Sequence, residues 1–587
     1  MRDGRNVERN LLNVMAAALA HRGPDGVGIH QDGAVGMLNT RLAIIDIAGG
    51  DQPFVTPGGQ ALVANGEIYN DPDLRFQLAG TAFRSLSDCE PPLHLYLRDG
   101  ITFARHLRGM FAIAIHDKPA DRLILSRDIY GIKQLYYVET PTCLAFASEP
   151  QALIRAGLAN RTIRPQARAE LLQLQFTTGR NTIFSDIKRV LPGETLVVEN
   201  GRVTQIHRLR PNGAPTAQPD RRPAYRDADH ALADLDRHLT DSVALHVRSD
   251  VPTGLFLSGG IDSSALLSVM ARLSSRPIIT LTAGFPGCGK DESEKAERVA
   301  RGAGADHNRI DVTAADFFTV MPQLAMAMDD PTTDSSALPI FLLAAGARRQ
   351  GLKVVLSGEG ADELFGGYKR YRRATWFFGL WRQKTRTRGV FRSDAGAYGC
   401  LQAWRDGLEQ AERAESRPYV SAIQTLQSID CAEWLPNDLL LKLDRCLMAH
   451  GVEGRTPFLD PVLSPFAYNL PADLKVRGNL GKWLLRDWVA KHAPAADPWS
   501  KKKGFIPPVG QWIAAYKDRI EPHLLTHPAM TELSLQPMIR QVFADPVRNP
   551  QACWSLIFYA LWYSCHIMGL PCDGAIDEVL NQSRLAA

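Results

Sequence analysis

The chain has 587 residues, which is too long for one hydrophobic core and predicts two to four domains. Lysine and arginine total 67 and aspartate and glutamate 63, so the net charge is only +4, which argues against a general polyanion binder. Hydrophobic residues make up 45% and charged residues 22%, the balance of an ordinary globular protein.

The first ~200 residues are rich in strand signals. A helix is expected over Leu11 to Ala20, and Gly-Gly pairs mark turns. Short apolar or β-branched runs predict strands at Gly36 to Asp46, Ala61 to Tyr69, Gly109 to His116, Arg122 to Ser126 and Leu135 to Val138. This pattern favours an α+β architecture with stacked antiparallel sheets.

A stretch rich in proline and arginine, Arg210 to Asp227, predicts an interdomain linker. Beyond it, strands alternate with helices, which predicts a doubly wound parallel sheet. The expected elements are Ala231 to Arg248 (helix), Gly254 to Leu257 (strand), Ser263 to Leu273 (helix), Pro277 to Ala283 (strand), Ser293 to Ala303 (helix) and Lys353 to Leu356 (strand). The remainder is mainly helical, and the apolar stretch Ala552 to Cys565 predicts a buried helix that is too short to span a membrane.

The nine cysteines are scattered and form no C-x-x-C pair. This pattern argues against a disulfide scaffold or a zinc ribbon and favours a reducing, cytoplasmic location. The charged N-terminus lacks the apolar core of a signal peptide.

Two glycine-containing loops follow predicted strands. The first, Ser258 to Ser264 (SGGIDSS), opens a helix, so its backbone N–H groups and hydroxyls suit a phosphate, and Asp262 could hold Mg²⁺ beside it. The second, Ser357 to Tyr368 (SGEGADELFGGY), places three acids in five residues, which repel one another unless a cation is near. Because ligands bind at the carboxyl ends of parallel strands, the two loops are expected to converge. The alternatives are a capped Gly-Gly turn and a solvated acidic turn.

Across nearly its whole length the chain resembles the asparagine synthetase B family. Besides the two loops, the matching strings are His21 to Gly26 (HRGPDG), Arg41 to Asp46 (RLAIID), Asn65 to Asn70 (NGEIYN), Ser87 to Glu90 (SDCE), Leu107 to Ala112 (LRGMFA), Arg127 to Lys133 (RDIYGIK), Ala147 to Glu149 (ASE), Leu191 to Glu194 (LPGE) and Glu453 to Asp460 (EGRTPFLD). The resemblance implies an α+β Ntn-type glutaminase sandwich over residues 1–205 with its first strand missing and a linker over 206–227. It implies next an α/β doubly wound PP-loop ATP-pyrophosphatase domain with a helical C-terminal part over 228–575, and an ammonia tunnel between the two sites.

By the same resemblance, the C-terminal site would use ATP and Mg²⁺ to convert aspartate to β-aspartyl-AMP, which ammonia then attacks. The residues implied to bind ATP are Leu257, Ser258, Gly259, Gly260, Asp262, Ser263, Ala283, Ser357 and Gly358. Asp262 and Asp362 would hold the metal, and Glu359 and Lys482 would be catalytic. Two anions meet when a carboxylate attacks a phosphate, so positive charge is needed there. Lys501 to Lys503 is a candidate pyrophosphate clamp, although a solvated charged loop is an equal reading.

The family's glutaminase uses an N-terminal cysteine whose own amine is the base. The implied glutamine-binding residues are Arg41, Asn65, Gly66, Glu67 and Asp88, although Asn65-Gly66 alone also reads as a hairpin turn. The sequence departs from the family here, because it begins Met1-Arg2-Asp3-Gly4 and no cysteine precedes Cys89. Cys89 is internal and cannot replace it. A misplaced start is favoured over an ammonia-dependent synthetase or a domain kept only for binding.

The expected partners are small molecules: aspartate, ATP, and glutamine or ammonia. Neither a membrane nor a nucleic acid is expected, and a homodimer is kept as an option. The competing enzyme reading is the same chemistry on another carboxylate, in cell-surface polymer or natural-product synthesis. A tRNA-modifying enzyme is a further alternative, because Lys369 to Arg392 is basic with interleaved aromatics, but an amphipathic helix with its aromatics packed inward is favoured. A non-catalytic scaffold is disfavoured by the complete set of acidic and lysine positions.

Overall fold

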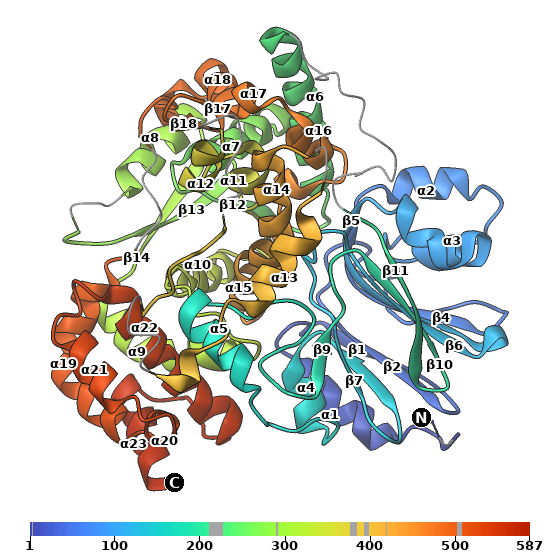
Figure 1. Cartoon of the computed structure of the whole chain (residues 1–587). Helices are drawn as coiled ribbons and strands as arrows, with labels where there is room; N and C mark the ends of the chain where they lie inside the picture. Colours follow the sequence, from blue (N-terminus) through green and yellow to red (C-terminus); the bar gives the residue numbers. More distant parts are fainter. Residues whose placement is uncertain are drawn as a thin grey trace.

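The computed structural model describes residues 1–2, 4–210, 227–288, 292–375, 384–391, 398–417, 420–501 and 507–586. The N-terminal part forms two layers of antiparallel strands with helices around them (Figure 1). Its elements are α1 (Arg9–Leu19), β1 (Gly26–Asp32), β2 (Val35–Arg41), β3 (Phe54–Val55), β4 (Gln60–Ile68), α2 (Asp71–Gln77), α3 (Pro91–Asp99), η1 (Gly100–His106), β5 (Gly109–Asp117), η2 (Lys118–Ala120), β6 (Arg122–Arg127), β7 (Tyr136–Glu139), β8 (Leu144–Ala147), α4 (Pro150–Arg155), α5 (Pro165–Leu174), β9 (Ile187–Arg189), β10 (Glu194–Glu199) and β11 (Arg202–Arg208).

The six-stranded sheet has the order β11-β10-β6-β5-β4-β3, and the facing layer contains the separate sets β1-β2 and β8-β7-β9. Strand β5 is buried on both faces, and its two faces serve different cores. Ile113 and Ile115 pack with side chains of α2 and α3, whereas the smaller Ala112 and Ala114 face β2 and β7. The period-2 alternation of a strand thus builds one core on each side, as a sandwich requires.

The C-terminal part is built on a parallel sheet with the order β14-β13-β12-β15-β16. Its elements up to this sheet's last strand are α6 (Ala228–His246), β12 (Thr253–Phe256), α7 (Ile261–Leu273), β13 (Ile279–Gly284), α8 (Ser293–Gly302), β14 (Asp306–Asp311), α9 (Ala314–Ala327), α10 (Ala337–Arg349), β15 (Val354–Leu356), α11 (Ala361–Phe365), α12 (Lys369–Ala374), η5 (Gly399–Leu401), α13 (Asp406–Glu415), α14 (Ala422–Ile429), the π-helical η6 (Asp430–Leu439), α15 (Leu440–Met448) and β16 (Glu453–Arg455). One face of the sheet shares a hydrophobic core with α9, α10 and α22 (Pro550–Trp562), and the other face shares one with α6, α7 and α18 (Trp483–His492). The strand order reverses between β12 and β15, which is where such sheets bind ligands.

The remaining elements are helical apart from one small hairpin, and the last helices gather at one end of the molecule (Figure 1). They are η7 (Pro457–Leu459), α16 (Leu463–Asn469), α17 (Ala472–Lys475), β17 (Val476–Arg477), β18 (Leu480–Gly481), α18 (Trp483–His492), η8 (Pro494–Ala496), α19 (Val509–Thr526), α20 (Pro528–Glu532), α21 (Gln536–Phe543), α22 (Pro550–Trp562), the π-helical η9 (Tyr563–Ile567) and α23 (Ile576–Ala586). Helix α22 is buried over most of its length, as its apolar sequence predicts. Within the described residues, every helix is too short or too polar to span a bilayer.

Each predicted element has a counterpart in the structure, but the predicted strand over Gly36 to Asp46 ends at Arg41, and the strands β1, β3, β8 to β11, β14 and β16 are not among those predicted. Strands β14 and β16 escaped prediction because their sequences, DHNRID and EGR, are polar and lack β-strand periodicity. The six-stranded sheet also takes in residues 206–208, which were assigned to the linker, because β11 runs to Arg208. Residues 211–226 of the predicted linker lie outside the described residues.

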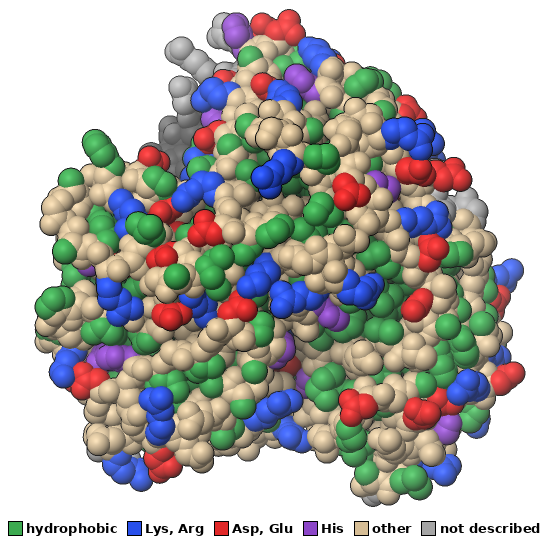
Figure 2. All heavy atoms as spheres, turned by 180° about the vertical axis from the view of Figure 1, so that it is seen from behind, with side chains coloured by type: hydrophobic (Ala, Val, Ile, Leu, Met, Phe, Trp, Pro, Cys, Tyr) green, Lys and Arg blue, Asp and Glu red, His purple; other side chains and the backbone are tan. Residues whose placement is uncertain are grey.

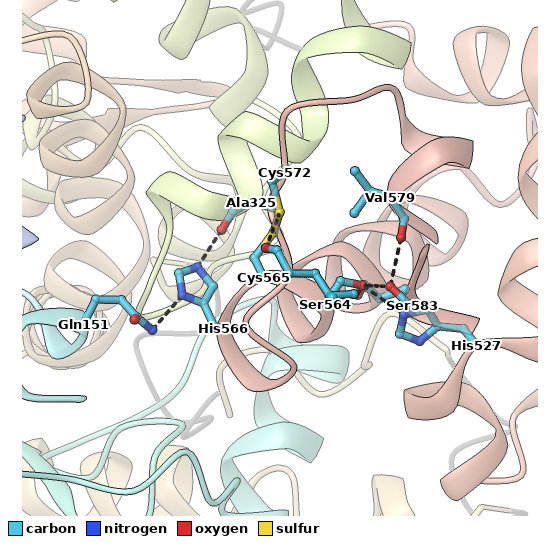
Figure 3. Close-up of a disulfide and its surroundings, with 11 residues drawn as sticks. Gln151, Ala325, His527, Ser564, Cys565, His566, Cys572, Val579 and Ser583 are labelled. Carbon is cyan, nitrogen blue, oxygen red and sulfur yellow. Dashed lines mark hydrogen bonds between the residues drawn. A yellow bond between two sulfur atoms is a disulfide. The ribbon is translucent and has the colours of Figure 1, made fainter. Parts of the chain in front are cut away.

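A disulfide joins Cys565 of η9 to Cys572 in the loop before α23 (Figure 3). It closes a short local loop, so the expectation of no disulfide scaffold needs this one correction; the other cysteines are free thiols. Beside it, the Nδ1 atom of His566 accepts from the Gln151 amide at 2.8 Å and its Nε2 donates to the Ala325 carbonyl at 3.0 Å. His566 therefore ties α4 of the N-terminal part to α9 of the C-terminal part.

Candidate active site

The first glycine loop connects β12 to α7 and is held by its own serines. The Ser263 hydroxyl accepts from the Ser258 backbone N–H at 3.2 Å and donates to the Gly260 carbonyl at 3.3 Å. Gly259 has a φ of +69°, and a Cβ there would lie 2.7 Å from the backbone nitrogen of Ala296. Only glycine fits this turn, which lies between the carboxyl end of β12 and the start of α7.

The second loop, from β15 to α11, lies directly against the first. A Cβ on Gly358 would approach the Asp262 Cβ to 3.0 Å, so the two loops are in contact. Ser357 donates its backbone N–H to the Arg455 carbonyl at 2.8 Å, which extends the pairing of β15 with β16. The predicted convergence of the two loops is therefore present in the fold.

Lys482 connects the carboxylates of the two loops. Its ammonium lies 2.6 Å from Asp262 Oδ2 and 2.6 Å from Asp362 Oδ1, and the residue is only 2% exposed. Burial acts to lower the pKa of Lys482, but the two carboxylates outweigh it and raise that pKa. Lys482 precedes α18 with a φ of +56°, an uncommon backbone conformation for a non-glycine residue. This arrangement points a fixed positive charge between the two acids.

The acids of this site also suit a magnesium ion. The second carboxylate oxygen of Asp262, Oδ1, is buried and has no hydrogen-bond partner among the described residues. A buried carboxylate oxygen without a partner is costly, and Mg²⁺ prefers oxygen ligands of this kind. Asp262 and Asp362, already held together by Lys482, therefore fit the ion that the resemblance implies.

Two glutamates of the second loop lie in an environment that disfavours their charge. Burial raises the pKa of Glu359, with Asp362 and Asp334 adding to the rise and Lys442 opposing it. Burial and the Asp362 carboxylate raise the pKa of Glu363 to about 8, and the Tyr368 hydroxyl donates to its Oε1 at 2.7 Å. Carboxyl groups with a pKa shifted in this way are concentrated at functional sites of proteins.

The sequence reasoning missed Lys442 and Asp334, which lie close enough to Glu359 to alter its pKa. The Lys442 ammonium donates to Asp334 Oδ2 at 2.5 Å and to Ser336 Oγ at 2.6 Å. In the sequence, Lys442 sits in the string LLKLDRC, where a lysine usually marks the solvated face of a helix. Its near-complete burial is a tertiary effect that no local pattern shows.

The other predicted ATP residues lie at the same edge of the sheet. Leu257 directly follows β12, and Ala283 lies near the end of β13; both are buried. The Leu257 N–H donates to the Leu281 carbonyl at 2.8 Å. Of the predicted pyrophosphate clamp, Lys501 is exposed, and the other two lysines lie outside the described residues. Most aromatic residues of the basic segment Lys369 to Arg392 also lie outside the described residues.

A cavity of about 500 Å³ lies in the N-terminal sandwich. All five predicted glutamine-binding residues line it: Arg41, Asn65, Gly66, Glu67 and Asp88. Burial raises the pKa of Asp88 to about 6. The hairpin interpretation of Asn65-Gly66 is wrong, because both residues lie inside β4 and pair with Ala112 and Phe111 of β5.

The same cavity separates two strands that the sandwich leaves unjoined. Its lining includes every residue of β2 and of β8, and these strands belong to different sets of the facing layer. The Met1 ammonium lies at its margin and donates to the Ala34 carbonyl at 2.7 Å. Cys89 also lines the cavity, but burial raises the pKa of its thiol well above the ordinary value, so it is poorly suited to act as a nucleophile.

A buried ion cluster links this cavity to the second loop. Arg455 of β16 lies 2.9 Å from Glu67 Oε2 and 3.0 Å from Glu453 Oε1, and Lys133 lies 3.0 Å from Glu453 Oε2. Arg455 is fully buried, and its backbone carbonyl accepts a hydrogen bond from the Ser357 N–H. One residue thus contacts both Glu67, a predicted glutamine-binding residue, and the second glycine loop.

Replacing Arg455 with methionine is expected to lower the free energy of unfolding by about 3–5 kcal/mol, because Glu67 then loses its buried ion-pair partner and Glu453 keeps only Lys133. Urea unfolding followed by tryptophan fluorescence measures the change. The matched control is Arg519→Met, because Arg519 pairs with Asp577 at the surface. Such a surface ion pair contributes about 1 kcal/mol or less to the free energy of unfolding. Equal losses in the two variants would contradict a structural role for the buried cluster.

Known proteins match both parts of the chain. Residues 234–564 match the asparagine synthase family, and residues 1–208 match the glutamine amidotransferase domain family. Asparagine synthetase 1 (glutamine-hydrolyzing) of Bacillus subtilis strain 168 is 30% identical over 608 aligned residues, covering 95% of this chain and 94% of its own. A putative asparagine synthetase (glutamine-hydrolyzing) of Mycobacterium tuberculosis strain H37Rv is 33% identical and covers 85% of this chain and 84% of its own. A relative with a different name, amidase chry2 of Gibberella zeae, is 28% identical and covers 81% and 80%.

Proposed function

Since this chain belongs to the asparagine synthase family of glutamine-hydrolysing ligases, we propose that its C-terminal domain converts L-aspartate to L-asparagine through β-aspartyl-AMP. The observation that carries the proposal is the position of Lys482 between Asp262 and Asp362, where the two glycine loops meet. A carboxylate and a triphosphate repel each other, and this is the point where the site supplies positive charge.

In the proposed first step, a β-carboxylate oxygen of aspartate attacks the α-phosphorus of ATP, and the bond to the β-phosphate oxygen breaks. Pyrophosphate leaves, and the first loop would cradle it with the N–H groups at the start of α7. Lys482 would face the negative charge that develops on the phosphates. Asp262 and Asp362 would hold Mg²⁺, which supplies further positive charge beside the phosphates when bound.

In the second step, ammonia attacks the acyl carbon of β-aspartyl-AMP, AMP leaves with the bonding electrons, and a proton is lost from the nitrogen. Glu359, whose pKa burial raises, is placed at the loop to assist formation or breakdown of this intermediate. The ammonia would come from glutamine held in the N-terminal cavity. There Arg41 would pair with the α-carboxylate, Asp88 with the α-ammonium, and Asn65 and Gly66 would form the oxyanion hole.

The acceptor acid is tested by ATP-dependent pyrophosphate release with ammonium and a panel of carboxylic acids. L-Aspartate is expected to exceed L-glutamate, β-alanine and succinate by roughly 100-fold or more, because a site built to pair a substrate's polar groups rejects analogues strongly. Mass spectrometry should find asparagine as the amide product. A different acid that reacts faster than aspartate would instead support the same ligase chemistry on another carboxylate.

A further inference from the structure

Two histidines and an aspartate meet between the two layers of the N-terminal sandwich, apart from both proposed sites. His30 and Asp32 lie two residues apart on β1, so their side chains leave the strand on the same face. His116 lies on β5 of the six-stranded sheet. The group therefore brings together residues from both layers of the sandwich.

The spacing of the two histidine nitrogens matches that of two ligands on one metal ion, and the carboxylate lies near them. His30 Nε2 and His116 Nδ1 are 3.2 Å apart, and one ligand atom from each of the three residues lies within 4.8 Å of the others. Two nitrogens bound to zinc at 2.0–2.1 Å with tetrahedral geometry are separated by roughly 3.3 Å. The two rings thus already stand at the spacing that a shared ion needs.

We propose that His30, Asp32 and His116 form a binding site for Zn²⁺ or a similar divalent transition-metal ion. Two imidazole nitrogens and one carboxylate oxygen form a three-ligand set that suits Zn²⁺, whereas Mg²⁺ and Ca²⁺ prefer oxygen alone.

Lys118 is the one described cation that the structure pairs with this group, and its ammonium lies 2.8 Å from Asp32 Oδ2. Its side chain is 59% exposed, so it can turn away into solvent at little cost. An ion bound here would compete with Lys118 for the Asp32 carboxylate. Removing the lysine should therefore strengthen metal binding.

Occupancy of this site would join the β1–β2 pair to the larger sheet. That pair is hydrogen-bonded to no third strand among the described residues. Strand β2 lines the cavity and ends at Arg41, a predicted glutamine-binding residue. A metal at His30, Asp32 and His116 would hold β1 in place and, through the hairpin, stabilise one wall of the cavity.

The test is Zn²⁺ titration of the metal-stripped full chain in excess Mg²⁺, which occupies the oxygen-rich ATP site. Wild type is expected to bind one more equivalent of Zn²⁺ than His30→Gln or Asp32→Asn. Where a variant still binds that equivalent, its affinity for Zn²⁺ should be at least about 10-fold weaker than that of wild type. Zn²⁺ should raise the unfolding temperature of wild type and not that of these variants. The Co²⁺ form should show visible absorption bands that both variants lose.

Two controls separate the site from other metal-binding groups. His207→Gln removes an exposed histidine of β11 and should leave the titration unchanged. Lys118→Met should bind Zn²⁺ more tightly than wild type. His30 and Asp32 are both partly exposed, so their variants should fold, and far-UV circular dichroism checks this. The proposal is overturned if folded His30→Gln and Asp32→Asn match wild type in the stoichiometry and affinity of Zn²⁺ binding. The contact between His30 and His116 would then be only a hydrogen bond.

Discussion

Replacing Asp262 with asparagine is expected to lower ATP-dependent pyrophosphate release at least about 100-fold. The substitution keeps the shape of the side chain and removes its charge. Asp262 is the point where both loops meet: it lies in the first turn of α7, contacts Gly358 and holds the Lys482 ammonium at 2.6 Å. Its loss would remove a proposed magnesium ligand and also release Lys482 from its fixed position.

The matched control is Asp236→Asn on α6. Asp236 accepts hydrogen bonds from Trp488 and from Arg272, which lies at the other end of α7. This control therefore removes an aspartate that contacts the same helix but lies away from the two loops. Pyrophosphate release by this control should stay within about twofold of wild type. If folded Asp262→Asn keeps more than a tenth of wild-type activity, Asp262 does not hold a magnesium ion that the reaction needs.

The parts of this site that follow strands were predictable from the sequence. A short apolar strand followed by Gly-Gly and a helix fixes where a phosphate loop lies, and parallel strands bring such loops to one edge. The convergence of the loops at Asp262 and Gly358 follows from these two facts alone. Lys482 is different, because it lies more than 200 residues from Asp262 and its position came only from a resemblance.

What escaped prediction depends on burial of charge across the fold. Lys442 and Arg455 are polar residues in helices or strands whose local sequences predict solvated faces. Both are buried because an acid from a distant segment meets them, Asp334 for Lys442 and Glu67 for Arg455. Such pairs leave no periodic signal in the sequence. The same holds for the polar strands β14 and β16, whose positions depend on neighbours in the sheet.

The polypeptide of residues 1–587 is expected to make asparagine from ammonium and to use glutamine at least roughly 1000-fold less well, the scale of loss when a nucleophile is removed. No cysteine precedes Cys89, and the Cys89 thiol is buried beside the Asp88 carboxylate, which with burial raises its pKa. Residues 1–587 supply every proposed glutamine contact in the cavity, but no N-terminal cysteine with its free amine. Asparagine formation with each nitrogen donor, measured by mass spectrometry, checks this.

A polypeptide lengthened at its N-terminus, beginning Met-Cys-Gly and supplying one strand ahead of Met1, is expected to gain glutamine-dependent synthesis. Among the residues that the structure describes, β2 and β8 each have one edge without a partner strand, and the cavity lies between them. An added strand would find hydrogen-bond partners there and is expected to place its first cysteine near Asn65 and Gly66. The matched control carries serine in place of that cysteine and should use ammonium alone. Equal rates with glutamine and ammonium in the unextended polypeptide would contradict the need for an N-terminal cysteine. If neither form uses glutamine while both use ammonium, the cavity does not position glutamine for hydrolysis, and the ATP site works on ammonia independently of it.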